Sequence, residues 1–209
     1  MTRTLVIDSA ATGDQSVSHK LTDALVEKLA ARRNDAEIVR RDIGADPIPH
    51  LHAGTVAAIR TGEATTDEAR AALSLSDALV AELAAADIVV IGAPMYNFGI
   101  PSTLKAWFDH VLRARVTFRY TEAGPEGLMN GKRAIVVESR AGLYSEGPSA
   151  AMDSQEPHLR TLLSFMGIDD VTFVRAEKLA FGPEAAETAI AKAVAQLEGL
   201  AAEELPLAA

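Results

Sequence analysis

A continuous apolar run that ends in small, turn-forming residues constrains the fold of this chain most strongly. Ile88–Ile91 is unbroken and mostly β-branched, which is typical of a strand buried on both faces of a parallel sheet. Small residues follow at once, and a helix is expected to begin near Pro101, with Ser102 or Thr103 able to cap its free N–H groups. The sequence therefore predicts a strand–loop–helix unit of an α/β protein.

The loop after this strand carries Met95, Tyr96, Asn97 and Phe98. Ligands of open α/β sheets bind at the carboxyl ends of the strands, where this loop begins. A flat heteroaromatic ligand needs apolar groups against its faces and a few hydrogen bonds at its edge, and these four residues offer both. An ordinary loop whose aromatic residues pack into the core is the alternative, and this segment alone leaves both open.

Strand-like and helix-like segments alternate along the whole 209-residue chain. Strands are expected at Thr4–Asp8, Glu37–Ile43, Ile88–Ile91, Arg133–Ser139 and Val171–Val174. Helices are expected around residues 21–29, over 67–86, through 105–111, around 159–166 and from 183 to about 200. Such an alternation is typical of βαβ units with right-handed crossovers.

The predicted fold class is therefore α/β, a doubly wound parallel sheet of five strands. In the flavodoxin-like order 2-1-3-4-5 the topological switch point lies between strands one and three, so the loops after strands one, three and four should form the site. The second strand is more polar and is expected at a sheet edge. No repeat or linker is visible, which indicates a single domain over residues 1–209.

Two other segments are too long to be simple connections. Residues 44–64 contain Pro47 and Pro49 and are expected to be irregular. Within residues 113–131, the side chains of Val116–Tyr120 alternate in character. This pattern is typical of a short hairpin strand, which we expect to project from the fold. Phe118 and Tyr120 on such an arm would be exposed in a monomer, which indicates an interface between two copies.

Composition and charge narrow the possible partners. The net charge of −9 argues against nucleic acid as the main partner, and the absence of cysteine excludes disulfides and thiolate chemistry. A strand is expected to begin at Thr4, so no signal peptide is expected, and no apolar run approaches the roughly 20 residues of a membrane span. We therefore expect a soluble, cytoplasmic protein.

The loop after the first strand runs from Ser9 to Ser18. Ser16 and Ser18 should lie at or near the N-cap of the next helix, where free N–H groups and hydroxyls suit a phosphate monoester. The loop matches neither a Walker A motif nor the GxGxxG dinucleotide fingerprint. Simple capping of the helix is the alternative.

The loop after the fourth strand begins Ser139-Arg140-Ala141-Gly142. Gly142 would allow the backbone to approach the edge of a ligand, and Tyr144 could cover one of its faces. The alternative is a turn-rich loop in which Arg140 faces solvent.

Side chains that could perform chemistry themselves are few. His50 and His52 have no further ligand at a suitable spacing, so no metal site is expected. His110 is expected at the surface or an interface, and no GxSxG nucleophile motif is present. A reaction at this site would therefore have to use the chemistry of a cofactor.

Three motifs together resemble the flavodoxin-like family of FMN-dependent NADH:azoreductases and NADH:quinone oxidoreductases. They are PMYNF at 94–98, VTFRYTEAGPEGL at 116–128 and Ser-Arg-x-Gly at 139–142, and the resemblance extends from Leu5 to about Gly182. It implies a homodimer with one FMN per subunit at the dimer interface, NADH as co-substrate and a quinone or azo compound as acceptor. It also implies ping-pong hydride transfer, in which two cycles cleave an azo bond to aromatic amines and no side chain acts as a nucleophile.

The resemblance also assigns residues to the site. Those implied to hold the FMN phosphate are Ser9, Ser16, Val17 and Ser18. Those implied to surround the isoalloxazine are Met95, Tyr96, Asn97 and Phe98 on one side and Ser139, Arg140, Ala141 and Gly142 at the other edge. Tyr120 is implied to reach over the flavin of the partner subunit, and Tyr120 and Asn97 are implied to assist positioning.

Two residues depart from the family pattern. Val17 replaces a common glutamine, which keeps a backbone N–H but loses any side-chain contact, and Ala141 replaces a common glycine, which could narrow the pocket. Two alternatives to the enzyme are a flavodoxin-type FMN electron carrier and a flavin-binding regulatory protein. The long arm at residues 113–131 favours the enzyme over the carrier, and consumption of NADH on addition of menadione would distinguish the enzyme from a regulatory protein.

Overall fold

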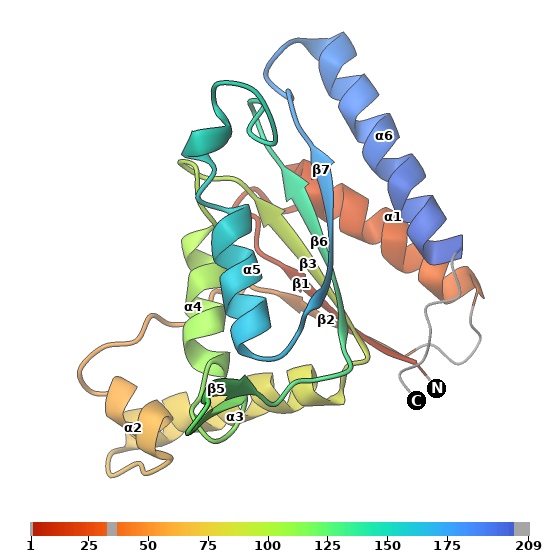
Figure 1. Ribbon diagram of the computed structural model, residues 1–209. Helices are drawn as coiled ribbons and strands as arrows, with labels where there is room; N and C mark the ends of the chain where they lie inside the picture. Colours follow the sequence, from red (N-terminus) through yellow and green to blue (C-terminus); the bar gives the residue numbers. More distant parts are fainter. Residues whose placement is uncertain (1, 33–36, 203–209) are drawn as a thin grey trace.

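The computed structural model describes residues 2–32 and 37–202. Its centre is a sheet of five parallel strands in the order β2-β1-β3-β6-β7 (Figure 1). The strands are β1 (Arg3–Asp8), β2 (Glu37–Asp42), β3 (Ile88–Pro94), β6 (Arg133–Ser139) and β7 (Asp170–Ala176). The two intervening strands, β4 and β5, form a separate hairpin, so the expected fourth and fifth strands of the sheet are β6 and β7. The polar second strand lies at an edge, as predicted.

Helices cover both faces of this sheet (Figure 1). One face packs against α1 (Val17–Arg32) and α6 (Pro183–Ala202), and the other against α3 (Asp67–Ala85), α4 (Ser102–Val111) and α5 (Glu156–Phe165). Side chains of successive strand residues point to opposite faces. Leu5 and Ile7 accordingly join one core, whereas Val6 joins the other. The continuous apolar runs of β1, β3 and β6 thus follow from burial on both sides.

Some boundaries differ from those that the sequence predicts. The segment at residues 44–64 is not irregular throughout, because it contains the short helix α2 (Val56–Thr61), which ends at Gly62 with a φ of 79°. β3 continues three residues past the predicted end to Pro94, because its register with β6 runs on to the pair Pro94–Ser139. The extension of β3 brings its carboxyl end level with that of β6.

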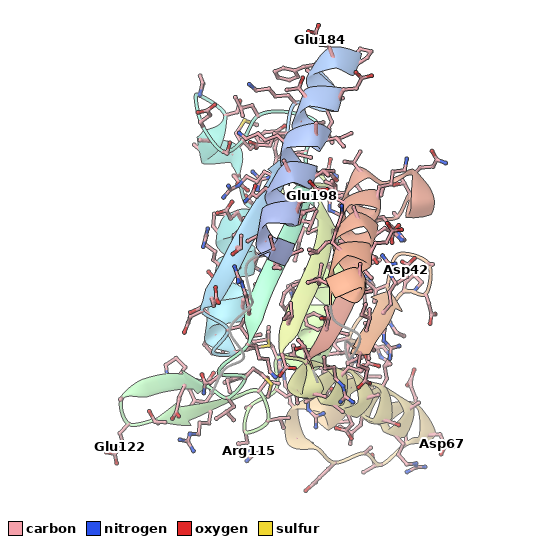
Figure 2. The ribbon with its side chains drawn as sticks, turned by 90° about the vertical axis from the view of Figure 1, so that its right-hand side faces the viewer. Asp42, Asp67, Arg115, Glu122, Glu184 and Glu198 are labelled. Carbon is pink, nitrogen blue, oxygen red and sulfur yellow. The ribbon has the colours of Figure 1, made fainter. Side chains whose placement is uncertain are left out.

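The predicted hairpin is present as β4 (Phe118–Thr121) and β5 (Gly124–Gly127). Figure 2 shows it extending away from the sheet, with Glu122 near its tip. Phe118 was expected to be exposed, which is wrong: it is only 8% exposed because its ring packs edge-on against Phe165, 4.6 Å between centroids. Tyr120 is 73% exposed. The arm therefore has a buried base and an exposed aromatic residue beyond it.

Among the described residues, no helix combines the length and the apolar character that crossing a bilayer requires.

Candidate active site

The loops that follow four adjacent strands of the sheet surround one cavity. Its volume is about 320 Å³, within the range of small-molecule sites. The loops follow β1, β3, β6 and β7, whose carboxyl ends lie at the same end of the sheet (Figure 1). The lining residues are Thr12, Gln15, Ser16, Val17, Pro94, Met95, Tyr96, Ser139, Arg140, Ala141, Leu179 and Ala180. The cavity therefore lies at the position expected from the predicted sheet.

The cavity brings together part of the predicted site. Predicted residues that line it are Ser16, Val17, Met95, Tyr96, Ser139, Arg140 and Ala141, and those that do not are Ser9, Ser18, Asn97, Phe98 and Gly142. Sequence reasoning missed Thr12, Gln15, Pro94, Leu179 and Ala180. Leu179 and Ala180 follow β7, and the position of that strand beside β6 was the available signal.

A larger cavity of about 680 Å³ lies beside the start of α6. It touches neither the loop after β1 nor the loop after β3. Its charged lining residues offer no excess of either sign, since three are basic and three acidic: Arg175, Lys178, Lys192, Glu146, Glu177 and Glu184. The smaller cavity, at the switch point of the sheet, is the candidate active site.

The loop after β1 ends at the N-terminus of α1. Ser16 and Ser18 are almost fully buried, and their hydroxyl oxygens lie 2.9 Å apart. The N–H of Lys20 donates to the Ser16 carbonyl, so the N–H groups of Val17, Ser18 and His19 come before the first intrahelical bond. Free N–H groups, a positive dipole end and hydroxyls are the features with which helix N-termini bind anions, so this loop is a candidate site for one.

Ser9 has a different place in this loop. Its hydroxyl donates to the Gly92 carbonyl at 2.6 Å, and its side chain is buried. Its carbonyl accepts a bond from the Thr103 hydroxyl at 2.9 Å. Ser102 or Thr103 was expected to cap this helix, but the N-cap of α4 is Pro101, with no side-chain cap. Ser9 and Thr103 therefore tie the loop to β3 and α4 beside the cavity.

The loop after β3 contains a tight turn from Tyr96 to Gly99. These two residues exchange N–H···O bonds of 3.0 and 3.1 Å, and both central residues, Asn97 and Phe98, have positive φ angles of 48° and 70°. This is the pattern of a type I′ turn, which costs energy for a residue such as phenylalanine. Phe98 does not line the cavity; it is 40% exposed and lies edge-on to Tyr144. Strain of this kind is concentrated at functional sites.

Tyr96 connects two of the loops. Its hydroxyl accepts a hydrogen bond from the Ala11 N–H at 3.1 Å. The loop after β3 is thereby joined to the loop after β1 through Tyr96, which lines the cavity.

The loop after β6 contributes backbone to the cavity and hides its charged side chain. The possibility that Arg140 faces solvent is wrong, since its side chain is fully buried. The guanidinium contacts Glu138 at 2.8 Å, Asp153 at 3.0 Å and Glu177 at 3.2 Å. The Arg140 carbonyl accepts from the Leu179 N–H at 3.2 Å, which joins the loops after β6 and β7. Arg140 thus lies beneath the cavity wall.

The charges around this guanidinium do not balance. Three guanidinium groups, of Arg140, Arg160 and Arg175, face four carboxyl groups, of Glu138, Asp153, Glu156 and Glu177. Burial raises the pKa of Glu138 to about 8, against the opposing effect of Arg140. The Oε1 atom of the same Glu138 carboxyl group is buried without a hydrogen-bond partner. A protonated Glu138 makes the cluster neutral, which supports the direction of this shift.

His110 lies outside the site. It was expected at the surface or an interface, but it is 2% exposed and its Nε2 lies 3.0 Å from the Pro49 carbonyl oxygen. Burial lowers the pKa of His110. The histidine is therefore a core residue that packs α4 against the segment before α2.

Known proteins resemble this chain over almost its full length. A family described as having a flavodoxin-like fold matches residues 2–200. An FMN-dependent NADH:quinone oxidoreductase of Hyphomonas neptunium is 53% identical, with 96% of each chain covered. A protein of the same name from Escherichia coli is 48% identical, over 97% of this chain and 100% of its own.

Solved structures agree with these relatives. An FMN-dependent NADH-azoreductase from Bacillus anthracis, crystallised in complex with FMN, superimposes with a TM-score of 0.88 at 27% identity, over 96% of this chain and 98% of its own. The fold is therefore shared with an azoreductase of known structure that binds FMN. The chain belongs to the flavodoxin-like family of FMN-dependent NADH:quinone oxidoreductases.

Proposed function

We propose that this protein is an FMN-dependent NADH:quinone oxidoreductase that also reduces azo compounds. The observation that carries this proposal is the cavity itself, which combines an anion site at the start of α1 with an apolar and backbone wall. The relatives bearing that name are about half identical over nearly the whole chain.

The residues present fit FMN. The N–H groups of Val17 and Ser18 and the hydroxyls of Ser16 and Ser18 would hold its phosphate. Met95 and Tyr96 would lie along the ring system, and the backbone of Ser139–Ala141 would face the other edge. When bound, FMN would supply the chemistry by accepting a hydride from NADH and passing the reducing equivalents to the acceptor.

The lining of the cavity supports a positioning role for the protein. None of the described residues that line it brings a carboxylate, imidazole or thiol to the cavity, and the Arg140 guanidinium is occupied beneath it. These residues bind, orient and exclude water. Turnover should therefore depend wholly on added or retained FMN.

The exposed hairpin supports a dimer. Tyr120 is an aromatic residue that is 73% exposed on a projecting arm, and exposed apolar groups of this kind are typical of interfaces. We infer that two copies pair so that Tyr120 of each reaches the cavity of the other. Size-exclusion chromatography with light scattering at sub-micromolar concentration should then give twice the 22.1 kDa of the chain.

Steady-state kinetics test the function. Purified protein with FMN should consume NADH when menadione is added, and the protein stripped of FMN should not. A flavodoxin-type carrier would show no sustained turnover with these two substrates alone. Parallel lines in double-reciprocal plots would support a ping-pong order, in which NADH and the quinone use the same face of the flavin in turn. Intersecting lines would contradict that order.

A further inference from the structure

The buried guanidinium of Arg140 joins segments that are distant in the sequence. Its donors reach Glu138 on β6, Asp153 and Gln155 just before α5, and Glu177 after β7. The Nε donates to the Gln155 Oε1 at 3.1 Å. All three of its nitrogen atoms are therefore used by acceptors of the protein itself.

Two of these partners, Gln155 and Glu177, in turn hold backbone groups of the segments around the cavity. The Gln155 Nε2 donates to the Ala93 carbonyl at the end of β3, at 2.8 Å. The neighbouring Ser154 N–H donates to the Phe98 carbonyl at 3.0 Å. Glu177 Oε1 accepts from the N–H groups of Tyr144 and Ser145 at 2.9 and 3.0 Å. One guanidinium thus stands behind the loops after β3, β6 and β7.

We propose that Arg140 is a positioning residue, whose side chain makes no contact with the flavin but fixes the three loops that would enclose the isoalloxazine. The inference rests on the proposed flavin-binding function. A lysine could preserve the charge but not the arrangement, because the planar guanidinium directs several donors at once and an ammonium cannot reproduce that fork.

A side chain that bound the phosphate would behave differently from one that positions these loops. Loss of a phosphate contact weakens FMN binding and spares riboflavin, which has no phosphate. Loss of loop positioning weakens both ligands by a similar factor, because both share the ring system. The ratio of the two affinities therefore separates the two roles.

The experiment compares Arg140→Lys with Arg41→Lys. Arg41 also makes a two-pronged pair, with Glu82, but it lies on the edge strand β2 and does not line the cavity. Dissociation constants for FMN and riboflavin would be measured by quenching of flavin fluorescence, and the visible circular dichroism of bound flavin would report its environment. We expect Arg140→Lys to weaken both ligands at least tenfold by a similar factor and to change the dichroism, with Arg41→Lys unchanged.

The results that overturn the inference are distinct from those that overturn the function. Unchanged affinities in Arg140→Lys, or a loss confined to FMN, contradict positioning. If Arg140→Lys does not fold, Gln155→Met removes the link to Ala93 without changing charge, and it should show the same joint loss; normal binding of both flavins would then contradict the inference. A wild-type protein that binds neither flavin would instead refute the proposed function.

Discussion

The loop after β1 and the loop after β6 line the same cavity but are held in opposite ways. The first is held by neutral hydrogen bonds, from the Ser9 hydroxyl to Gly92 and from the Ala11 N–H to Tyr96. The second is held by the buried charge of Arg140. At one end of the cavity, then, hydroxyl groups and N–H groups at the start of α1 remain for a charged ligand group. At the other end the guanidinium of Arg140 is buried, and the backbone of the loop after β6 faces the cavity. The charge there holds the loop in place.

The largest expected effect concerns the charged cluster behind the loop after β6. The pKa of Glu138 is raised from an ordinary 4.5 to about 8 in the folded protein. Between pH 4.5 and pH 8, therefore, the folded protein keeps a proton on Glu138 that the unfolded chain has released. This group's contribution to stability is therefore lost as the pH rises from 4.5 to 8. The loss should be on the order of a few kcal/mol, since each unit of pKa shift is worth about 1.4 kcal/mol.

Glu138→Gln, which resembles the protonated acid, should remove this dependence. Urea unfolding at pH 5 and pH 8 should show the variant gaining stability relative to the wild type as the pH rises. Glu198→Gln is the matched control, because Glu198 is a surface residue paired with Lys28 and its pKa is lowered by that partner. If the stability of the wild type and of Glu138→Gln depended equally on pH, the Glu138 carboxyl group would be ionised in the folded protein, and the prediction would be wrong.

The next effect concerns the donors of the loop after β1. A hydrogen bond to a charged group contributes roughly 1.5–3 kcal/mol, so Ser18→Ala should weaken FMN binding by about tenfold or more. Riboflavin binding should change much less. Fluorescence titrations with both flavins measure the difference, and an equal loss for both would remove the assignment of the phosphate to this loop.

The smallest effect concerns the bond between two of the loops. Tyr96→Phe removes the acceptor of the Ala11 N–H, which should cost about 0.5–1.5 kcal/mol of unfolding free energy. Because the bond is neutral, the cost should be the same at pH 5 and pH 8, unlike that of the Glu138 substitution. Chemical denaturation at pH 5 and at pH 8 tests this. A cost that depended strongly on pH would show that the loop after β1 is not held independently of the charged cluster behind the loop after β6.

The positions of the strands could be predicted because burial leaves a local trace in the sequence. Ile88–Ile91 is an apolar run whose residues are at most 4% exposed, and its place in the sheet follows from that run. The motif at residues 94–98 likewise placed Met95 and Tyr96 at the cavity. Among the lining residues that were missed, Leu179 and Ala180 lie in a segment with no feature of its own that marks them.

The sequence by itself determined the alternation of elements, the position of the carboxyl-end loops and the family. Only the tertiary structure decided that Arg140 points inward, that Phe118 packs against Phe165 and that His110 is buried. Hydrophobic periodicity is a property of neighbouring residues, so it can be read along the chain. The partners of Arg140 lie up to 37 positions away, and which charges meet depends on how the strands and helices pack.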